Sequence, residues 1–266
     1  FKIQNNLNIN GPVIVHSDIF QTRHLLKQKV NIKTNPNLIL KEHFEKLENA
    51  FGKDNLCFPS FNYDFTKNGI YSVKQSESQV GVLSNYILNK NILSRTHVPV
   101  FSFLYGKNFC GDYKNSPFQE NSIFSEIYDD NGIILFYGAG IDSCTYLHFV
   151  ESQCGPPQYR YDKKFQGTIE INEDQIKKTS VNFHVRPYGL GLDYDWIFLY
   201  EILEKANAIK FLDTNVFYVR ARDLSELWAD EILRDSTSIL SNSCKMMIKE
   251  KLTELNRRFE LTDFEK

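Results

Sequence analysis

Residues 133–151 read IILFYGAGIDSCTYLHFVE and contain the pattern that decides the fold. The apolar start, 133–137, is short and is followed by Gly138-Ala139-Gly140, which predicts a buried strand that ends in a sharp turn. Asp142 or Ser143 could then cap a helix that begins after the turn. A buried strand that leads through glycines into a helix is a basic unit of α/β proteins.

The predicted helix carries a candidate acid–base pair. His148 and Glu151 are three residues apart and therefore share a helix face, and Cys144, four residues before His148, lies on the same side. A histidine can accept a proton near neutral pH, and a carboxylate can orient its ring. The residues alone leave a second interpretation open, in which His148 is a structural residue with Glu151 as its solvent-side partner. The position of Cys144 suits a small buried residue that fills space in the core better than it suits a nucleophile.

The composition favours a globular enzyme of one domain, residues 1–266. With 42% hydrophobic residues the chain can bury a full core. A net charge of −2 argues against a nucleic-acid partner, and the absence of any apolar run near ~20 residues argues against a membrane span. The first residues do not resemble a secretion signal, and the five cysteines include no CxxC pair. We therefore expect a cytoplasmic protein with free thiols and no zinc motif.

Strand and helix patterns alternate along the first half of the chain. Short apolar runs predict strands at 12–15, 56–58, 100–104 and 133–137, and helical spacing predicts helices at 38–51, 81–88 and 122–128. Further on, the patterns predict a hairpin of 165–171 with 180–185, a helix at 194–206, and one or two helices within 224–259. This order predicts a layered α/β/α sandwich around a central mixed sheet, with a C-terminal helical portion.

Six short motifs follow one another between residues 13 and 151. They are Val15-His16-Ser17-Asp18, Cys57-Phe58-Pro59-Ser60-Phe61, Val80-Gly81-Val82-Leu83-Ser84-Asn85, Arg95-Thr96-His97-Val98-Pro99-Val100-Phe101-Ser102, Ser116-Pro117, and Gly138 with Asp142, Thr145, Leu147, His148 and Glu151. Their order resembles that of the aminoglycoside 3-N-acetyltransferase family, also called the antibiotic N-acetyltransferase family. The remaining 115 residues resemble this family only in general character, without a matching motif.

The resemblance implies transfer of an acetyl group from acetyl-CoA, or a related acyl-CoA, to an amino group of an aminosugar. It makes His148 the general base, which suits the chemistry because an ammonium cannot attack a thioester until it loses a proton. Glu151, or a carboxylate from elsewhere in the chain, would orient the ring and stabilise the imidazolium. Thr145 would donate a hydrogen bond to the developing oxyanion or to the leaving thiolate.

The resemblance also implies where the two substrates bind. His16, Ser17, Arg95, Thr96 and Ser102 match positions at the coenzyme site, where hydroxyls, backbone amides and a guanidinium suit phosphates and pantetheine. Alternatively, Arg95 could be a surface ion-pair partner, and His16 could anchor its own loop.

The expected acceptor-binding residues are Asp64, Asp142 and Arg186. Asp64 would contact a cationic substrate, although it could equally be an ordinary loop aspartate. The segment 183–187 offers Arg186 where family members that bind aminoglycosides carry acidic residues, which favours an anionic acceptor such as a nucleotide-linked aminosugar. A second departure is that Val98, and not a histidine, precedes Pro99, so His97 inherits no role.

Two other functions remain open from the residues. Cys144 could carry the acyl group covalently, with His148 and Glu151 as partners, in a ping-pong transferase or thioesterase. The chain could also bind an acyl-CoA without catalysis, because a fold alone does not define a function. A metal hydrolase is disfavoured, because the histidines are scattered without ligand spacing. The sequence leaves a monomer and a homodimer equally possible.

Overall fold

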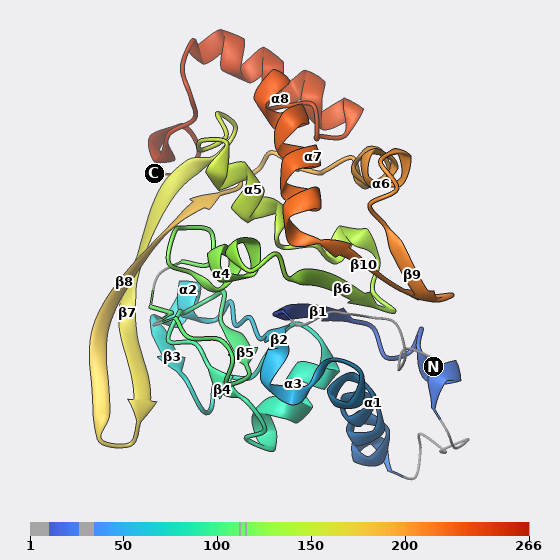
Figure 1. Cartoon of the computed structure of the whole chain (residues 1–266). Helices are drawn as coiled ribbons and strands as arrows, with labels where there is room; N and C mark the ends of the chain where they lie inside the picture. The colour runs from blue at the N-terminus through green and yellow to red at the C-terminus, as the bar shows by residue number, and fades with distance from the viewer. Residues whose placement is uncertain (1–10, 27–34, 112, 115, 266) are drawn as a thin grey trace.

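The computed structural model describes residues 11–26, 35–111, 113–114 and 116–265, and within them a seven-stranded mixed sheet forms the centre (Figure 1). Its strands lie in the order β4 (Ser94–Arg95), β5 (Phe103–Tyr105), β2 (Leu56–Pro59), β1 (Val13–Ser17), β6 (Ile133–Tyr137), β10 (Val216–Arg220) and β9 (Lys210–Asp213). The three central strands, β2, β1 and β6, run parallel, and the strands on both sides pair antiparallel.

Alternation of side chains along β1 and β6 divides the interior into two cores. Val13, Val15 and Leu135 face one core, which packs against α1 (Pro36–Phe51) and α3 (Val82–Asn89). Ile14 and Phe136 face the other, which packs against the remaining longer helices. Because both faces are covered, β6 is buried along its whole length.

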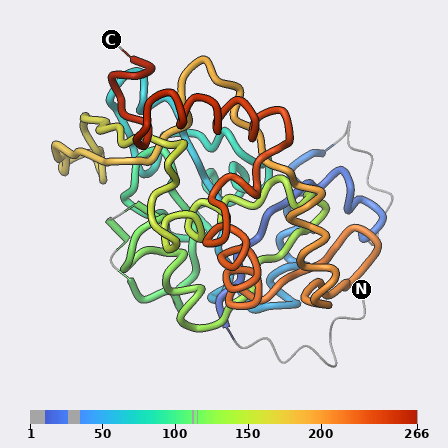
Figure 2. Tube along the Cα trace, turned by 90° about the horizontal axis from the view of Figure 1, so that it is seen from above, coloured from blue at the N-terminus to red at the C-terminus, as the bar shows by residue number. Residues whose placement is uncertain are grey.

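The second face of the sheet carries most of the helices. They are α4 (Ile123–Asp129), α5 (Leu147–Gln153), α6 (Trp196–Lys205), α7 (Ala221–Arg234) and α8 (Asn242–Leu255). Figure 2 shows α7 and α8, coloured orange to red, lying over this face. Shorter helical pieces are η1 (Arg23–Leu25), η2 (Lys53–Asn55), α2 (Phe65–Asn68), η3 (Ile141–Ser143) and η4 (Leu261–Asp263). Within the described ranges, no helix combines the length and the apolar character that crossing a bilayer requires.

A long hairpin forms a second, smaller sheet beside the first. β7 (Tyr161–Asn172) and β8 (Gln175–Val185) pair antiparallel, and β3 (Ile70–Ser72) adds to β7 in parallel. The hairpin extends along one side of the molecule in Figure 1. Its strands are longer than the segments 165–171 and 180–185 that the sequence predicts, because pairing continues through residues without a clear alternating pattern.

The layered α/β architecture predicted from the sequence is confirmed. The hairpin of β9 and β10, which extends the central sheet beyond β6, was not predicted. The helix after β6 begins later than the sequence predicts, because residues 141–143 form the 3₁₀ turn η3 and α5 begins only at Leu147. Neither Asp142 nor Ser143 caps α5, and Cys144 lies before it.

Gly138 allows the chain to leave β6 and turn toward α5. Its φ of +80° lies in the left-handed region, and a Cβ placed there would be 2.2 Å from the carbonyl oxygen of Asp18. Its amide donates to the carbonyl of Asn215 at 2.8 Å, and the amide of Asp18 donates to the carbonyl of Tyr137 at 2.9 Å. Close approach of the chain after β1 to the end of β6 therefore requires a glycine.

We expect Gly138→Ala to lower the free energy of unfolding by about 2 to 4 kcal/mol, because backbone strain and a steric clash add together. Gly155→Ala is the matched control, since Gly155 also has a positive φ (+93°) but has no atom within 4 Å of the added Cβ. It should cost only about 1 kcal/mol. Urea denaturation of both variants measures the difference, and equal losses would show that the contact with Asp18 is unimportant.

Candidate active site

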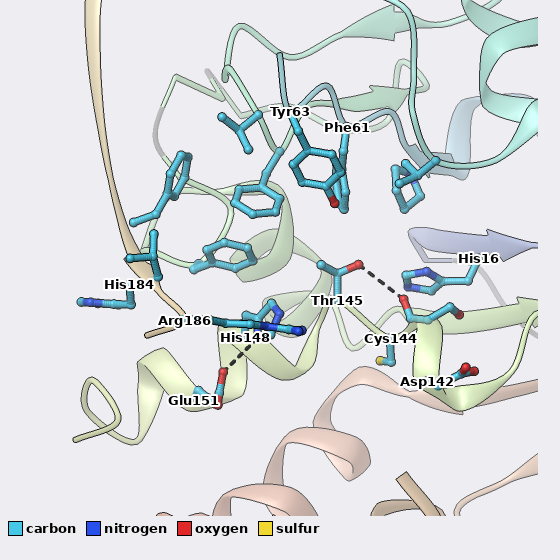
Figure 3. A pocket seen from close by; sticks show the side chains of 18 of the residues that line it. His16, Phe61, Tyr63, Asp142, Cys144, Thr145, His148, Glu151, His184 and Arg186 are labelled. Atoms are coloured by element: carbon cyan, nitrogen blue, oxygen red, sulfur yellow. Dashed lines mark hydrogen bonds and ion pairs between the residues drawn. The ribbon is translucent and has the colours of Figure 1, made fainter. Parts of the chain in front are cut away.

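A cavity of about 670 Å³ opens where β1 and β6 end. His16 and Ser17, at the end of β1, line it together with Ala139 and residues 142–145 from the connection after β6. The opposite wall is largely aromatic and includes Phe61 and Tyr63. Figure 3 shows His148 and Glu151 across the cavity from these two rings. A cleft at the carboxyl ends of parallel strands is the usual ligand site of an open α/β sheet.

His148 and Glu151 form a hydrogen-bonded pair on α5. The Nδ1 atom of His148 lies 2.9 Å from Oε2 of Glu151, an i,i+3 contact along the helix. The His148 side chain is 21% exposed, whereas that of Glu151 is 2% exposed. A carboxylate at this distance favours the tautomer with the proton on Nδ1, which leaves Nε2 as an acceptor for a ligand.

Glu151 is surrounded by donors from distant segments. Its Oε1 accepts hydrogen bonds from the hydroxyls of Tyr159 at 2.6 Å and Tyr194 at 2.8 Å. Its Oε2 lies 3.4 Å from Nε of Arg160. Burial alone would raise the pKa of Glu151, but the Arg160 charge and the hydrogen bond from His148 more than offset it and bring the pKa to about 2. The carboxylate is therefore ionised at neutral pH.

His148 is held in its neutral form. Burial lowers its pKa below the usual value, and the charge of Arg160 lowers it further, while the interaction with Glu151 opposes both effects. A neutral imidazole with one free nitrogen in a cavity is a competent proton acceptor.

Thr145 and the end of β1 lie next to the pair. Figure 3 shows Thr145 between His16 and His148, with its hydroxyl directed toward the carbonyl of Ser143, 3.5 Å away. His16 stacks on Phe136 with ring centroids 5.5 Å apart, and burial lowers its pKa to about 4. Its Nε2 is buried and has no hydrogen-bond partner among the described residues.

Three predicted coenzyme-binding residues lie away from the cavity. Arg95 is buried and donates to the carbonyls of Ser60 at 2.7 Å and Ser76 at 2.5 Å, among others. Ser102 is also buried and donates to the carbonyl of Ser60, while the hydroxyl of Thr96 accepts from the amide of Phe103. These side chains join loops to one another, so the structure does not support their assignment to the coenzyme. Because Arg95 is buried, it is not a surface ion-pair partner either.

Only some of the predicted acceptor-binding residues line the cavity. Asp142 and Arg186 are exposed and line the cavity, whereas Asp64 does not line it, although its neighbour Tyr63 does. The carbonyl of Asp64 accepts hydrogen bonds within the first turn of α2. The structure therefore does not bring Asp64 to the cavity, and places Arg186 beside His148 (Figure 3).

Cys144 lines the cavity but is poorly suited to covalent chemistry. It is 2% exposed, and burial raises the pKa of its thiol to about 12, so almost no thiolate forms at neutral pH. Since it precedes α5, it also lacks the helical spacing to His148 that the sequence predicts. These features disfavour a covalent acyl intermediate on Cys144.

Sequence reasoning missed the partners of Glu151 and the aromatic wall. Arg160, Tyr159 and Tyr194 come from connections that no spacing rule links to α5. The clustered wall residues are Phe61, Tyr63, Phe101, Phe118 and Phe183. The sequence shows the high aromatic content but not that these rings meet. Among the described residues, no group of three His, Cys, Asp or Glu side chains is arranged to hold a metal ion.

The chain belongs to the aminoglycoside 3-N-acetyltransferase family, whose model matches residues 28–231. Acetyl-CoA is the co-substrate of this family. No curated protein sequence matches the chain significantly.

Solved structures share the fold at low sequence identity. The aminoglycoside acetyltransferase AAC(3)-IVa, as apoenzyme, has a TM-score of 0.64 and 18% identity, over 89% of this chain and 86% of that chain. AAC-IIIb in a binary complex with CoASH has a TM-score of 0.67 and 14% identity, over 86% and 92%. The YokD protein from Bacillus subtilis has a TM-score of 0.65 and 14% identity, over 86% and 88%. At these identities the likeness concerns the fold alone.

The pKa of Glu151 makes a prediction about acid stability. Because the pKa is about 2 in the folded protein and its ordinary value is 4.5, the ionised carboxylate stabilises the fold above pH 4.5, and this contribution is lost as the pH falls toward 2. The contribution is about 3 kcal/mol. We expect the unfolding free energy of the wild type to fall more steeply over this interval than that of Glu151→Gln. Urea denaturation from neutral pH to about pH 3 measures both slopes, and parallel slopes would contradict the assigned pKa.

Proposed function

We propose that this protein transfers an acetyl group from acetyl-CoA to a primary amino group of an aminosugar, with His148 as general base, and that residues 1–266 act as one acyltransferase domain. The observation that carries the proposal is the neutral His148, held by the ionised Glu151 at the cavity wall. Membership of the acetyltransferase family supports the reaction class.

The chemistry follows from the geometry of the pair. Nε2 of His148 takes a proton from the acceptor amine while the amine nitrogen attacks the thioester carbonyl carbon. The C–N bond forms, the C–S bond breaks, and coenzyme A leaves as a thiolate that regains a proton. Glu151 keeps the Nδ1 proton in place and stabilises the imidazolium that forms. The hydroxyl of Thr145 donates to the oxyanion or to the departing sulfur.

The two substrates occupy opposite ends of the cavity in this proposal. The coenzyme end is formed by His16 and Ser17. The acceptor end is formed by the aromatic wall with Arg186. Asp142 lies on the coenzyme side in Figure 3, nearer to His16 than to Arg186, which leaves the acceptor end without that carboxylate.

Charge at the acceptor end favours an anionic aminosugar, such as a nucleotide-linked one, over an aminoglycoside. Arg186 is exposed, and no carboxylate in the described part of the chain forms an ion pair with it. Its charge would repel a polycation and attract a phosphate. AAC(3)-IVa, by contrast, has been solved in complex with a gentamicin, so aminoglycosides remain the second acceptor class to be measured.

We expect His148→Gln to lower kcat by about 10²-fold or more, because general-base catalysis is lost while the cavity keeps its shape. Release of the coenzyme thiol from acetyl-CoA, with a UDP-linked aminosugar and with gentamicin as acceptors, measures the rate. Unchanged turnover in this variant would contradict the proposed base.

Cys144→Ser is the matched control for the His148 variant, since both side chains line the cavity. It should retain turnover because the thiol takes no part in the reaction, and loss of turnover would instead favour a covalent mechanism. Binding of acetyl-CoA by the wild type without thiol release to any amine would indicate a non-catalytic binding protein.

We expect Arg186→Gln to raise KM for the UDP-linked aminosugar about 5- to 10-fold, as one exposed charge-assisted hydrogen bond is lost. KM for gentamicin should fall or stay the same. Arg234→Gln is the control, because Arg234 is exposed on α7 and pairs with Glu231 outside the cavity. An equal effect of Arg186→Gln on both acceptors would contradict an anionic acceptor site.

A further inference from the structure

Arg160 occupies an unusual position behind the His148–Glu151 pair. It lies in the connection between α5 and β7 and is buried. Its Nη1 donates to the carbonyl of His184 at 3.0 Å, and its Nη2 donates to the hydroxyl of Tyr194. The same Nη2 lies 3.4 Å from Nδ1 of His148, and Nε lies 3.4 Å from Oε2 of Glu151. The guanidinium thus faces both members of the pair.

The carboxylate does not need Arg160 for hydrogen bonds. Two tyrosine hydroxyls already donate to Oε1 of Glu151, and His148 donates to Oε2. The charge of Arg160 also helps to offset the cost of burying the carboxylate. What Arg160 adds, and a neutral donor could not, is a positive charge next to the imidazole.

That charge counteracts a side effect of Glu151. A buried carboxylate 2.9 Å from a histidine favours the imidazolium, and a histidine that is already protonated cannot act as a base. A fixed cation 3.4 Å from the same nitrogen disfavours a second positive charge. Burial of the ring is the larger effect that keeps it neutral, and the charge of Arg160 adds to it, so that Glu151 can orient the ring without protonating it at rest.

Other groups that face His148 do not replace this effect. Tyr194, which precedes α6, is 3.5 Å from Nδ1, and burial raises its pKa above the usual value, so it stays neutral. Arg186, which follows β8, also lowers the pKa of His148 but by less than Arg160 does. His184, on β8, pairs with Asp162 and points away from His148 in Figure 3. The other side of the ring meets Phe118.

We propose that Arg160 is a positioning residue for the transfer, which fixes the Glu151 carboxylate against His148 and keeps the imidazole uncharged until the amine delivers its proton. The inference rests on the proposed role of His148 as general base. It assigns to the buried arginine a role in the ionisation of the base, in addition to its place in the fold.

The ionisation of His148 can be measured directly by NMR, without any acceptor. The Hε1–Cε1 resonance of His148, identified by its loss in His148→Gln, is titrated in the wild type, Arg160→Gln and Arg160→Lys. We expect Arg160→Gln to raise the pKa of His148 by about one pH unit or more, and Arg160→Lys to restore a value near that of the wild type. The control Arg222→Gln, at an exposed arginine that binds the carbonyl of Tyr128, should cause no change.

If Arg160→Gln does not fold, the same comparison is made in a background without the carboxylate charge. The double variant Glu151→Gln/Arg160→Gln leaves no buried charge in contact with His148, and its His148 should titrate at a higher pH than in Glu151→Gln alone. No rise in either comparison, or a rise that Arg160→Lys does not reverse, would overturn the proposal.

Kinetics separate this inference from the proposed function. In Arg160→Gln the acidic limb of the kcat/KM profile for acetyl transfer should move to higher pH by the same amount as the NMR titration, with KM for acetyl-CoA unchanged. A lower kcat with an unshifted limb would mean a purely structural role for Arg160. If the NMR shift occurs but the wild type acetylates no amine, the effect of Arg160 on His148 stands and the proposed function fails.

Discussion

The buried carboxylate of Glu151 is the constraint on which the site depends. An ionised group taken out of water is costly unless charges and hydrogen bonds compensate it, and here the compensation comes from separate segments. His148 belongs to the same helix, Tyr159 and Arg160 follow that helix, and Tyr194 precedes α6. Displacement of any of these segments would remove a hydrogen bond or a charge that compensates the buried carboxylate. The carboxylate therefore couples the geometry of the His148–Glu151 pair to the packing of α5 and of the connections that follow it.

The sheet determines where this assembly meets a ligand. Alternation along β1 directs Ile14 and His16 to the same face as Phe136 of β6, so that His16 reaches the cavity at the end of the strand. The turn at Gly138 then brings the chain past that end toward α5. Two short-range features, the period of a strand and the φ of one glycine, thus place His16 and His148 in one cavity.

Sequence patterns predicted those features of the structure that depend on interactions between residues close in the chain. The strands 133–137 and 12–15, the main helices, and the contact of His148 with Glu151 depend on neighbours within a few residues, and the structure agrees with them. Contacts between distant segments carried no comparable signal, so the roles of Arg160 and Tyr194 were not predicted. The hairpin of β9 and β10 was missed because its pairing with β6 has no local signature.

The motif around Arg95 shows a different limit. The resemblance of this motif to a family pattern indicated where it lies in the fold. Phosphate binding by Arg95 would require in addition that N–H groups of its guanidinium are not already hydrogen-bonded within the protein. In the structure those donors are taken up by carbonyls of Ser60, Val73 and Ser76. Whether a guanidinium is free for a ligand depends on every loop around it, and no single motif contains that information.

Charge compensation also distinguishes the two arginines at the cavity. Arg160 is buried and its charge is compensated by Glu151, so it offers an incoming substrate no net attraction. Arg186 is exposed beside an aromatic wall and has only the carbonyl of Leu192, at 3.4 Å, as a hydrogen-bond acceptor among the described residues. A guanidinium at the edge of an apolar surface attracts a group that is both anionic and partly planar, because the two contributions act on different parts of the ligand.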